Sequence, residues 1–283
     1  TITLAELLNK DLKGIWNVGK PLPRVYTVEG WEKHVKPALD QAVKDSKNTD
    51  WVLGGNLHQA PVTEAAINSL KERYFKEYAA AWYDMMNSIT WQPRTTNLDA
   101  VNQFHVYADP QRSPLVALFH AVKESSQLDS KKIDVNPAVT DAAKRAAARQ
   151  LSARSRRVAD TVLNSQAENI NALEGKVDDY LAGPLEAEFE NLLQLIDAQI
   201  NPKSDLSLQR YLERVTTIKQ RLIQMASSSD TGGVARSAVQ GVLNGGDNEF
   251  LEGMQYARLI EAGVGDRLLP FARNVFVLPF NSV

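Results

Sequence analysis

The histidines are the side chains of this sequence best suited to acid–base chemistry or metal binding. There are four, His34, His58, His105 and His120, and they lie on separate predicted elements. No HExxH motif occurs, and no two histidines have the spacing that places two ligands on one helix face. His105 and His120 are closest in sequence, but helix-cap or surface roles are the stronger expectation for them. We therefore expect no metal site.

Paired carboxylates are the second candidate chemistry. Asp178 with Asp179, and Glu186 with Glu188, are in principle a general acid and a general base. Neighbouring helix positions diverge by about 100 degrees, so solvated helix faces are the stronger expectation. A GxSxG elbow, a GxxxxGK[ST] loop and a GxGxxG turn are all missing from the sequence. We expect a protein that is not an enzyme and that binds no cofactor.

A helical hydrolase that uses Asp or Glu with His120 or His58 is the rival hypothesis. A pocket uniting a histidine with two carboxylates would favour it, and histidines spread over the surface would count against it.

A run of positive charge is the one charge feature that stands out. No acidic residue lies between Ala142 and Val158. A solvated helix face is the first interpretation, and a docking surface for an acidic partner, or a groove for a peptide or helix, is the second. No aromatic residues are interleaved, so nucleic acid is not expected as the partner. This basic stripe consists of Lys144, Arg145, Arg149, Arg154, Arg156 and Arg157.

The overall composition excludes several classes of protein. The 32 Lys and Arg residues balance 34 Asp and Glu residues, which gives no strongly basic field for nucleic acid. The absence of cysteine rules out disulfides, thiolate metal sites and a cysteine nucleophile. No apolar stretch approaches the ~20 residues of a membrane helix. A start at Thr1 with no leader suggests an excised fragment or a mature segment.

Helices are the elements predicted to carry these residues. Thr3 and Glu6 form a capping box for a short opening helix, and Thr27 caps a helix in which Pro37 predicts a kink. Asn97 and Ser113 are predicted caps of two further helices. The strongest amphipathic pattern runs from Thr63 to about Trp91. The aromatic residues expected to pack in the core are Trp31, Trp51, Tyr74, Tyr78, Trp82 and Trp91.

The second half is predicted to consist of antiparallel helices. An Ala-rich pattern begins at Asn136, and further apolar periodicities cover 185–196, 208–222 and 247–275. The apolar run Val275–Phe280 is a candidate short terminal strand. We predict a mainly α-helical, multi-helix bundle with long amphipathic helices. The polar stretch Ser125–Val135 suggests a boundary between helical subdomains 1–135 and 136–283.

A series of short motifs resembles the IcmF/TssM family of type VI secretion proteins. They include VYTVEGW from Val25, VKPAL from Val35 and DWVLG from Asp50. That family has a helix with the motif Tyr-x-x-acidic-Tyr-x-x-x-Trp. The similar residues of this chain are Tyr74, Glu77, Tyr78 and Trp82. The later motifs are Ser113–Leu115 with Leu118, Tyr211–Leu212 and Phe276–Phe280.

This resemblance implies a periplasmic helical region of a bacterial inner-membrane protein. The family's partners would be a TssL-type inner-membrane protein and a TssJ-type outer-membrane lipoprotein, with self-association in the full complex. The membrane helices and the C-terminal β-rich domain of the family lie outside this chain. The resemblance also assigns Gly30 and Gly54 to turns or close packing, and it offers no role for the basic stripe.

Overall fold

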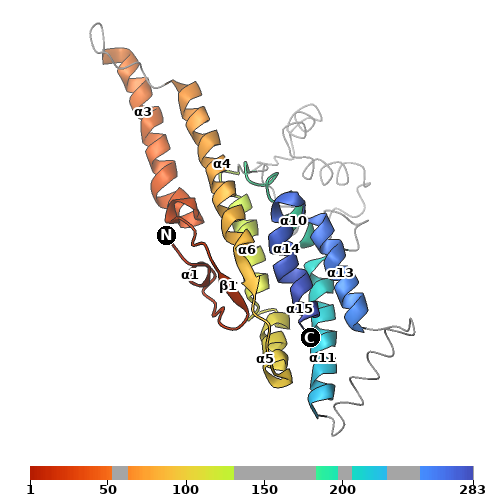
Figure 1. Ribbon diagram of the computed structural model, residues 1–283. Helices are drawn as coiled ribbons and strands as arrows, with labels where there is room; N and C mark the ends of the chain where they lie inside the picture. Colours follow the sequence, from red (N-terminus) through yellow and green to blue (C-terminus); the bar gives the residue numbers. More distant parts are fainter. Residues whose placement is uncertain (53–62, 131–182, 197–205, 228–248, 283) are drawn as a thin grey trace, which may run out of the picture. The chain divides into compact units, whose positions relative to one another are not determined.

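Helices dominate the structure, a computed structural model that describes residues 1–52, 63–130, 183–196, 206–227 and 249–282 (Figure 1). In these ranges one sheet occurs, in which β1 (Trp16–Val18) pairs antiparallel with β2 (Ile89–Trp91) and Trp16 lies opposite Trp91. The predicted mainly α-helical fold is confirmed. Of the helices described, none combines the length and the apolar character needed to cross a bilayer.

The chain divides into two compact units. The first comprises Thr1–Ile2, Leu22–Trp82 and Glu124–Phe189, and the second comprises Thr3–Pro21, Tyr83–Lys123 and Glu190–Val283. The helical elements are α1 (Leu4–Leu8), η1 (Arg24–Tyr26), α2 (Val28–Gly30), η2 (Trp31–Val35), α3 (Lys36–Val52), α4 (Glu64–Asn87), α5 (Asn97–Ala108), α6 (Pro114–Ser126), α10 (Glu190–Ile196), α11 (Leu208–Ser227), α13 (Glu249–Gly263), η3 (Asp266–Leu268), α14 (Leu269–Ala272), η4 (Arg273–Val277) and α15 (Leu278–Asn281).

Aromatic side chains form the core of the first unit. Trp31 and Tyr78 are almost fully buried, and Trp82 stacks on Tyr78 with ring centroids 6.1 Å apart. Trp82 Nε1 donates to the Tyr26 carbonyl at 3.0 Å, and the Tyr74 hydroxyl donates to the Val25 carbonyl at 2.7 Å. These bonds fix the segment before α2 against α4, as expected from the periodicity of α4. Core packing is thus confirmed for Trp31, Tyr78 and Trp82, whereas Tyr74 is only half-buried at the edge of this core.

The entry into α2 depends on Thr27 and Gly30. The Thr27 hydroxyl accepts the Gly30 N–H at 3.0 Å, as predicted for an N-cap. A Cβ on Gly30 would lie 2.2 Å from the Arg24 carbonyl oxygen, so only glycine allows this approach of the two backbone segments. The capping box at Thr3 is confirmed as well, because Glu6 N donates to Thr3 Oγ1 at 3.3 Å and Thr3 N donates to Glu6 Oε2 at 2.8 Å.

Two π-helices each end just before a proline. In η2 the Lys36 N–H bonds to the Trp31 carbonyl, and Pro37 follows; in η4 the Leu278 N–H bonds to the Arg273 carbonyl, and Pro279 follows. A proline ring clashes with the carbonyl four residues earlier and offers that carbonyl no N–H. Widening to an i→i+5 turn relieves that clash. The break predicted at Pro37 therefore takes the form of a π-helical turn.

The core of the second unit surrounds η4. Pro279 leaves the Val275 carbonyl without its usual helical donor, and the buried Tyr107 hydroxyl donates to it at 2.7 Å. The Tyr211 hydroxyl lies 3.2 Å from the same oxygen and 3.1 Å from the Phe276 carbonyl. Phe276 meets the Tyr211 ring edge to face at 4.9 Å. Tyr107 from α5 and Tyr211 from α11 thus supply hydroxyl donors at the one carbonyl, that of Val275, whose helical donor the proline removes.

Four predictions of local structure are wrong. Asn97 is the first residue of α5 and not its cap, because the Thr96 hydroxyl accepts the Asp99 N–H at 3.2 Å. The run Val275–Phe280 is helical, because Val275, Phe276 and Val277 are buried as a helix segment, and a short apolar run does not distinguish a buried helix from a strand. The helix predicted for 63–91 ends at Asn87, and Ile89–Trp91 pairs with β1. Residues 185–189 form turns before α10.

The side chain of Asn87, the last residue of α4, bonds to the backbone of a segment far along the chain. Its Nδ2 donates to the Arg267 carbonyl at 2.8 Å, and its Oδ1 accepts the Phe271 N–H at 3.2 Å. Both bonds join the end of α4 to the η3–α14 segment.

Several sequence predictions lie outside the described residues. These are the whole basic stripe, His58, the pair Asp178–Asp179, the boundary at 135, and the Ala-rich helix from Asn136.

Candidate functional site

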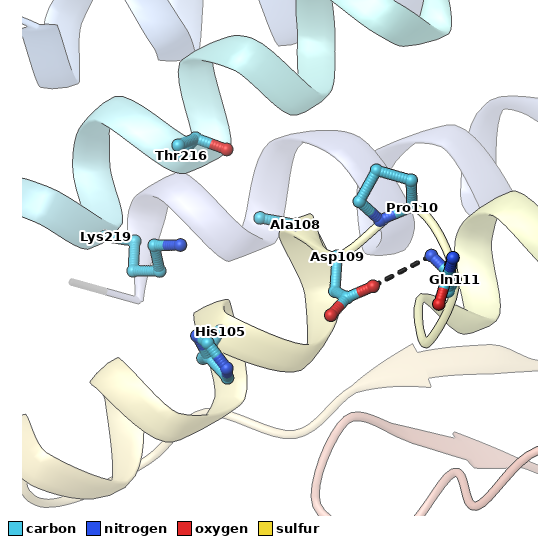
Figure 2. A pocket seen from close by; sticks show the side chains of 7 residues that line it. All are labelled: His105, Ala108, Asp109, Pro110, Gln111, Thr216 and Lys219. Carbon is cyan, nitrogen blue, oxygen red and sulfur yellow. Dashed lines mark hydrogen bonds between the residues drawn. The ribbon is translucent and has the colours of Figure 1, made fainter.

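The candidate site is a shallow hollow of about 500 Å³ in the second unit, where the end of α5 meets the middle of α11 (Figure 2). Helix α5 contributes His105 and Ala108, and α11 contributes Thr216 and Lys219. The loop between α5 and α6 closes one side. The lining residues from that loop are Asp109, Pro110 and Gln111.

The carboxylate of Asp109 is used to shape this loop. Its Oδ1 accepts the Gln111 N–H at 2.8 Å and the Arg112 N–H at 3.1 Å. These backbone donors, Gln111 first, hold the pKa of Asp109 below its usual range, so the group stays charged. The Thr216 hydroxyl donates to the Leu212 carbonyl at 2.9 Å and is likewise engaged. Two of the polar groups in the hollow therefore serve local structure.

In the described part of the chain, the side chains of Lys219 and His105, unlike those of Asp109 and Thr216, are not engaged in local structure. Among the described residues neither side chain makes a hydrogen bond or an ion pair, and both line the hollow from opposite helices (Figure 2). Lys10 lies at the rim, since its Nζ donates to the Gln111 carbonyl at 2.6 Å. The hollow thus presents an ammonium group and an imidazole that are available to a partner.

The described histidines do not converge. His34 lies in η2 in the first unit, His105 lines the hollow in the second, and His120 is exposed on α6. The hollow holds one histidine and one carboxylate, which is short of the two carboxylates that the hydrolase hypothesis requires. Across the described ranges no three His, Asp or Glu side chains gather as metal ligands would.

Sequence reasoning missed Thr216, Lys219 and Gln111. A signal existed on α11, where Thr216, Lys219 and Ile223 share one face at helical spacing. It gave no prediction because the opposite wall comes from α5, more than a hundred residues earlier in the chain. The predicted partner-binding residues of the basic stripe lie outside the described residues and stay a prediction.

Comparison with known families identifies the N-terminal part of the chain. Residues 2–127 match the family model described as "IcmF-related: Intracellular multiplication and human macrophage-killing". The chain carries an IcmF-related region. The resemblance drawn from the motifs is confirmed, and the VYTVEGW, VKPAL, DWVLG and Ser113–Leu115 motifs all fall within the matched residues.

Solved structures extend the similarity beyond the IcmF-related region. A chain from a structure described as "Type VI secretion system membrane core complex" is 25% identical, with a TM-score of 0.68 over 99% of this chain and 44% of that one. A chain described as "Type VI membrane complex" is 24% identical, with a TM-score of 0.57 over 90% of this chain and 39% of that one, and it shows the fold alone. Our chain spans less than half the length of either. The comparison with curated proteins gave no match.

Proposed function

We propose that this chain is a non-catalytic scaffold segment of a type VI secretion membrane complex, located in the periplasm. The observation that carries the proposal is the similarity over 99% of the chain to a chain of the type VI membrane core complex, at 25% identity. The match includes the part that follows residue 127, so it supports one role for the IcmF-related region and the helices after it.

The two cores support a mechanical role. Tyr107, Tyr211 and Trp82 are fully or almost fully buried, and their polar atoms bond to backbone carbonyls far away in the sequence. Such cores hold helices in fixed relation without exposing reactive groups. A scaffold transmits force or sets spacing through contacts of this kind, and it requires no turnover.

By family resemblance, the partners are a TssJ-type outer-membrane lipoprotein and a TssL-type inner-membrane protein, with self-association in the complex. The first test is biolayer interferometry of this 283-residue chain against the soluble part of the lipoprotein over a salt series. Binding that weakens with salt would locate a charged docking surface in this chain. Absence of binding would make the chain a spacer, with the lipoprotein held by another part of the full-length protein.

A second test addresses the scaffold role itself. The full-length protein, tagged and extracted with detergent, is expected to co-purify with both membrane partners, and deletion of this segment is expected to abolish secretion. Normal secretion by the deletion strain would contradict the proposal.

The periplasmic location is testable because the chain has no cysteine. A cysteine introduced at the exposed Leu259 is expected to react in intact cells with a maleimide that crosses the outer but not the inner membrane. The unmodified full-length protein is the control for other cysteines. Labelling only after cell lysis would contradict a periplasmic location.

A further inference from the structure

Helices α5 and α11 pack against each other, and we call the surface that they share, from the hollow to Leu98 and Ile223, the α5–α11 groove. The hydroxyls of Tyr107 on α5 and Tyr211 on α11 meet at the Val275 carbonyl. The hollow is lined by His105, two residues before Tyr107 on α5, and by Lys219, eight residues after Tyr211 on α11. The two helices therefore run in opposite directions. Leu98 precedes His105 by two helical turns, and Ile223 follows Thr216 by two turns, so both lie on the faces that line the hollow.

One end of this groove is unusual for a surface. Leu98 is 66% exposed and Ile223 is 46% exposed, and each is a large apolar side chain in water. Single exposed apolar residues need no explanation, but these two lie at the same end of one pair of helices, beyond the polar hollow. The groove therefore has an apolar end at Leu98 and Ile223 and a polar end at His105 and Lys219.

The charge at the polar end is positive. Lys219 lines the hollow, Lys10 bonds to its rim, and Arg112 is exposed in the loop that closes it. The one carboxylate that lines the hollow, Asp109, stays charged and offsets one of these three cations, so the net charge of this end is positive. A ligand that complements this end carries a carboxylate, and one that complements the whole groove carries apolar side chains beside it.

We propose that the α5–α11 groove binds an amphipathic, acidic peptide segment of a partner protein. A carboxylate of the segment pairs with Lys219 and accepts a hydrogen bond from His105, while its apolar side chains cover Leu98 and Ile223. This is the helix-in-groove mode of recognition, in which apolar anchors supply contact area and charge sets the register. The inference goes beyond the scaffold function and does not depend on it, since either can fail while the other stands.

The test uses two matched helical peptides, one built from Leu, Ala and Glu and the other with every Glu replaced by Gln. Binding to the 283-residue chain is followed by methyl NMR at Leu98, Thr216 and Ile223. The acidic peptide is expected to shift these methyl signals, with an affinity that falls as salt is added, and the Gln peptide is expected to bind at least about fivefold more weakly.

Charge reversal supplies the matched control. Lys219→Glu is expected to weaken the acidic peptide about tenfold, because it replaces an attraction with a repulsion. Arg258→Glu, at an exposed cation on α13 outside the groove, is expected to leave affinity unchanged. Lys219→Met tests the same cation if the reversed charge perturbs folding. Equal binding of both peptides, equal effects of Lys219→Glu and Arg258→Glu, or no shifts at the groove methyls would overturn the proposal.

Discussion

The hydroxyls of Tyr107 and Tyr211 replace an N–H that Pro279 removes from the backbone. Burial raises the pKa of both phenols well above 10, and it raises the pKa of Tyr78 to about 12. In the unfolded chain these groups lose their protons near pH 10, whereas the folded chain holds them more tightly. The contribution of these tyrosines to stability is therefore fully present below pH 10 and falls as the pH rises from there towards the folded pKa values.

The expected result is a steep alkaline loss of stability. Each of these tyrosines lowers the free energy of unfolding by about 1.4 kcal/mol per pH unit above its unfolded pKa. Urea unfolding between pH 9 and about 11.5 measures the slope. Tyr107→Phe is expected to remove the contribution of one tyrosine, about 1.4 kcal/mol per pH unit, from the slope. It is also expected to lower the free energy of unfolding by about 1 to 2 kcal/mol at pH 7, because the Val275 carbonyl loses its hydrogen bond from the Tyr107 hydroxyl. An unchanged slope in this variant would contradict the assignment.

Gly30 is the position where one added methyl group has the largest predictable effect. In Gly30→Ala the new Cβ meets backbone oxygens of Arg24 and Val25, which cannot move as a flexible side chain can. We expect a loss of about 2 to 3 kcal/mol, measured by chemical denaturation.

Gly263→Ala is the matched control. Among the residues that the structure describes, its Cβ meets only Leu206 Cδ1, at an ordinary contact distance of 3.6 Å, and alanine favours the helix. Stability is expected to stay the same or rise by up to about 1 kcal/mol. A similar loss in both variants would show that the close approach at Gly30 is not the cause.

At the scale of elements, Asn87 joins the end of α4 to the η3–α14 segment through two backbone bonds. Asn87→Ala removes both, and the expected cost is about 1 to 2 kcal/mol. Hydrogen exchange at the Phe271 amide is expected to accelerate more than exchange in α11. The control is Asn274→Ala, which removes one exposed bond to the Pro270 carbonyl. Exchange at Phe271 that is unchanged by Asn87→Ala would contradict this role.

The sequence predicts elements well where the signal is local. The periodicity of α4 and α11, the capping box at Thr3 and the break at Pro37 all appear as expected. Ser113 precedes α6 as predicted, yet its buried hydroxyl has no hydrogen-bond partner in the described part of the chain. The strand pair and the helical run at Val275 depend on contacts between distant segments, which a local pattern does not contain.

The candidate site could not be predicted from the sequence for the same reason. Lys219 and His105 are ordinary exposed-face residues when each helix is considered alone, and they become a site only when α5 and α11 lie side by side. The basic stripe, by contrast, is conspicuous in the sequence, and its role is a prediction about the whole molecule.

At the scale of the whole molecule, the stripe can be tested in the full-length protein. Reversal of charge at Arg149 and Arg156 is expected to abolish partner binding if the stripe docks an acidic surface, because each contact changes from attraction to repulsion. Co-purification of the membrane partners measures the effect. Charge reversal of the exposed Lys76 on α4 is the control. Unchanged co-purification in the stripe variant would identify a solvated helix face.

The bond from Tyr107 to Val275 has a consequence for biosynthesis, since 168 residues separate its two ends. At a synthesis rate of about 5 to 20 residues per second, the buried face of α5 leaves the ribosome roughly 10 to 30 s before its partner exists. Closing such a long loop is also slow, because its entropy is lost before the contact forms. During that interval Phe104 and Tyr107 have only earlier partners such as Trp16 and Trp91, so part of their apolar surface stays exposed, and we expect chaperones to bind the nascent chain there.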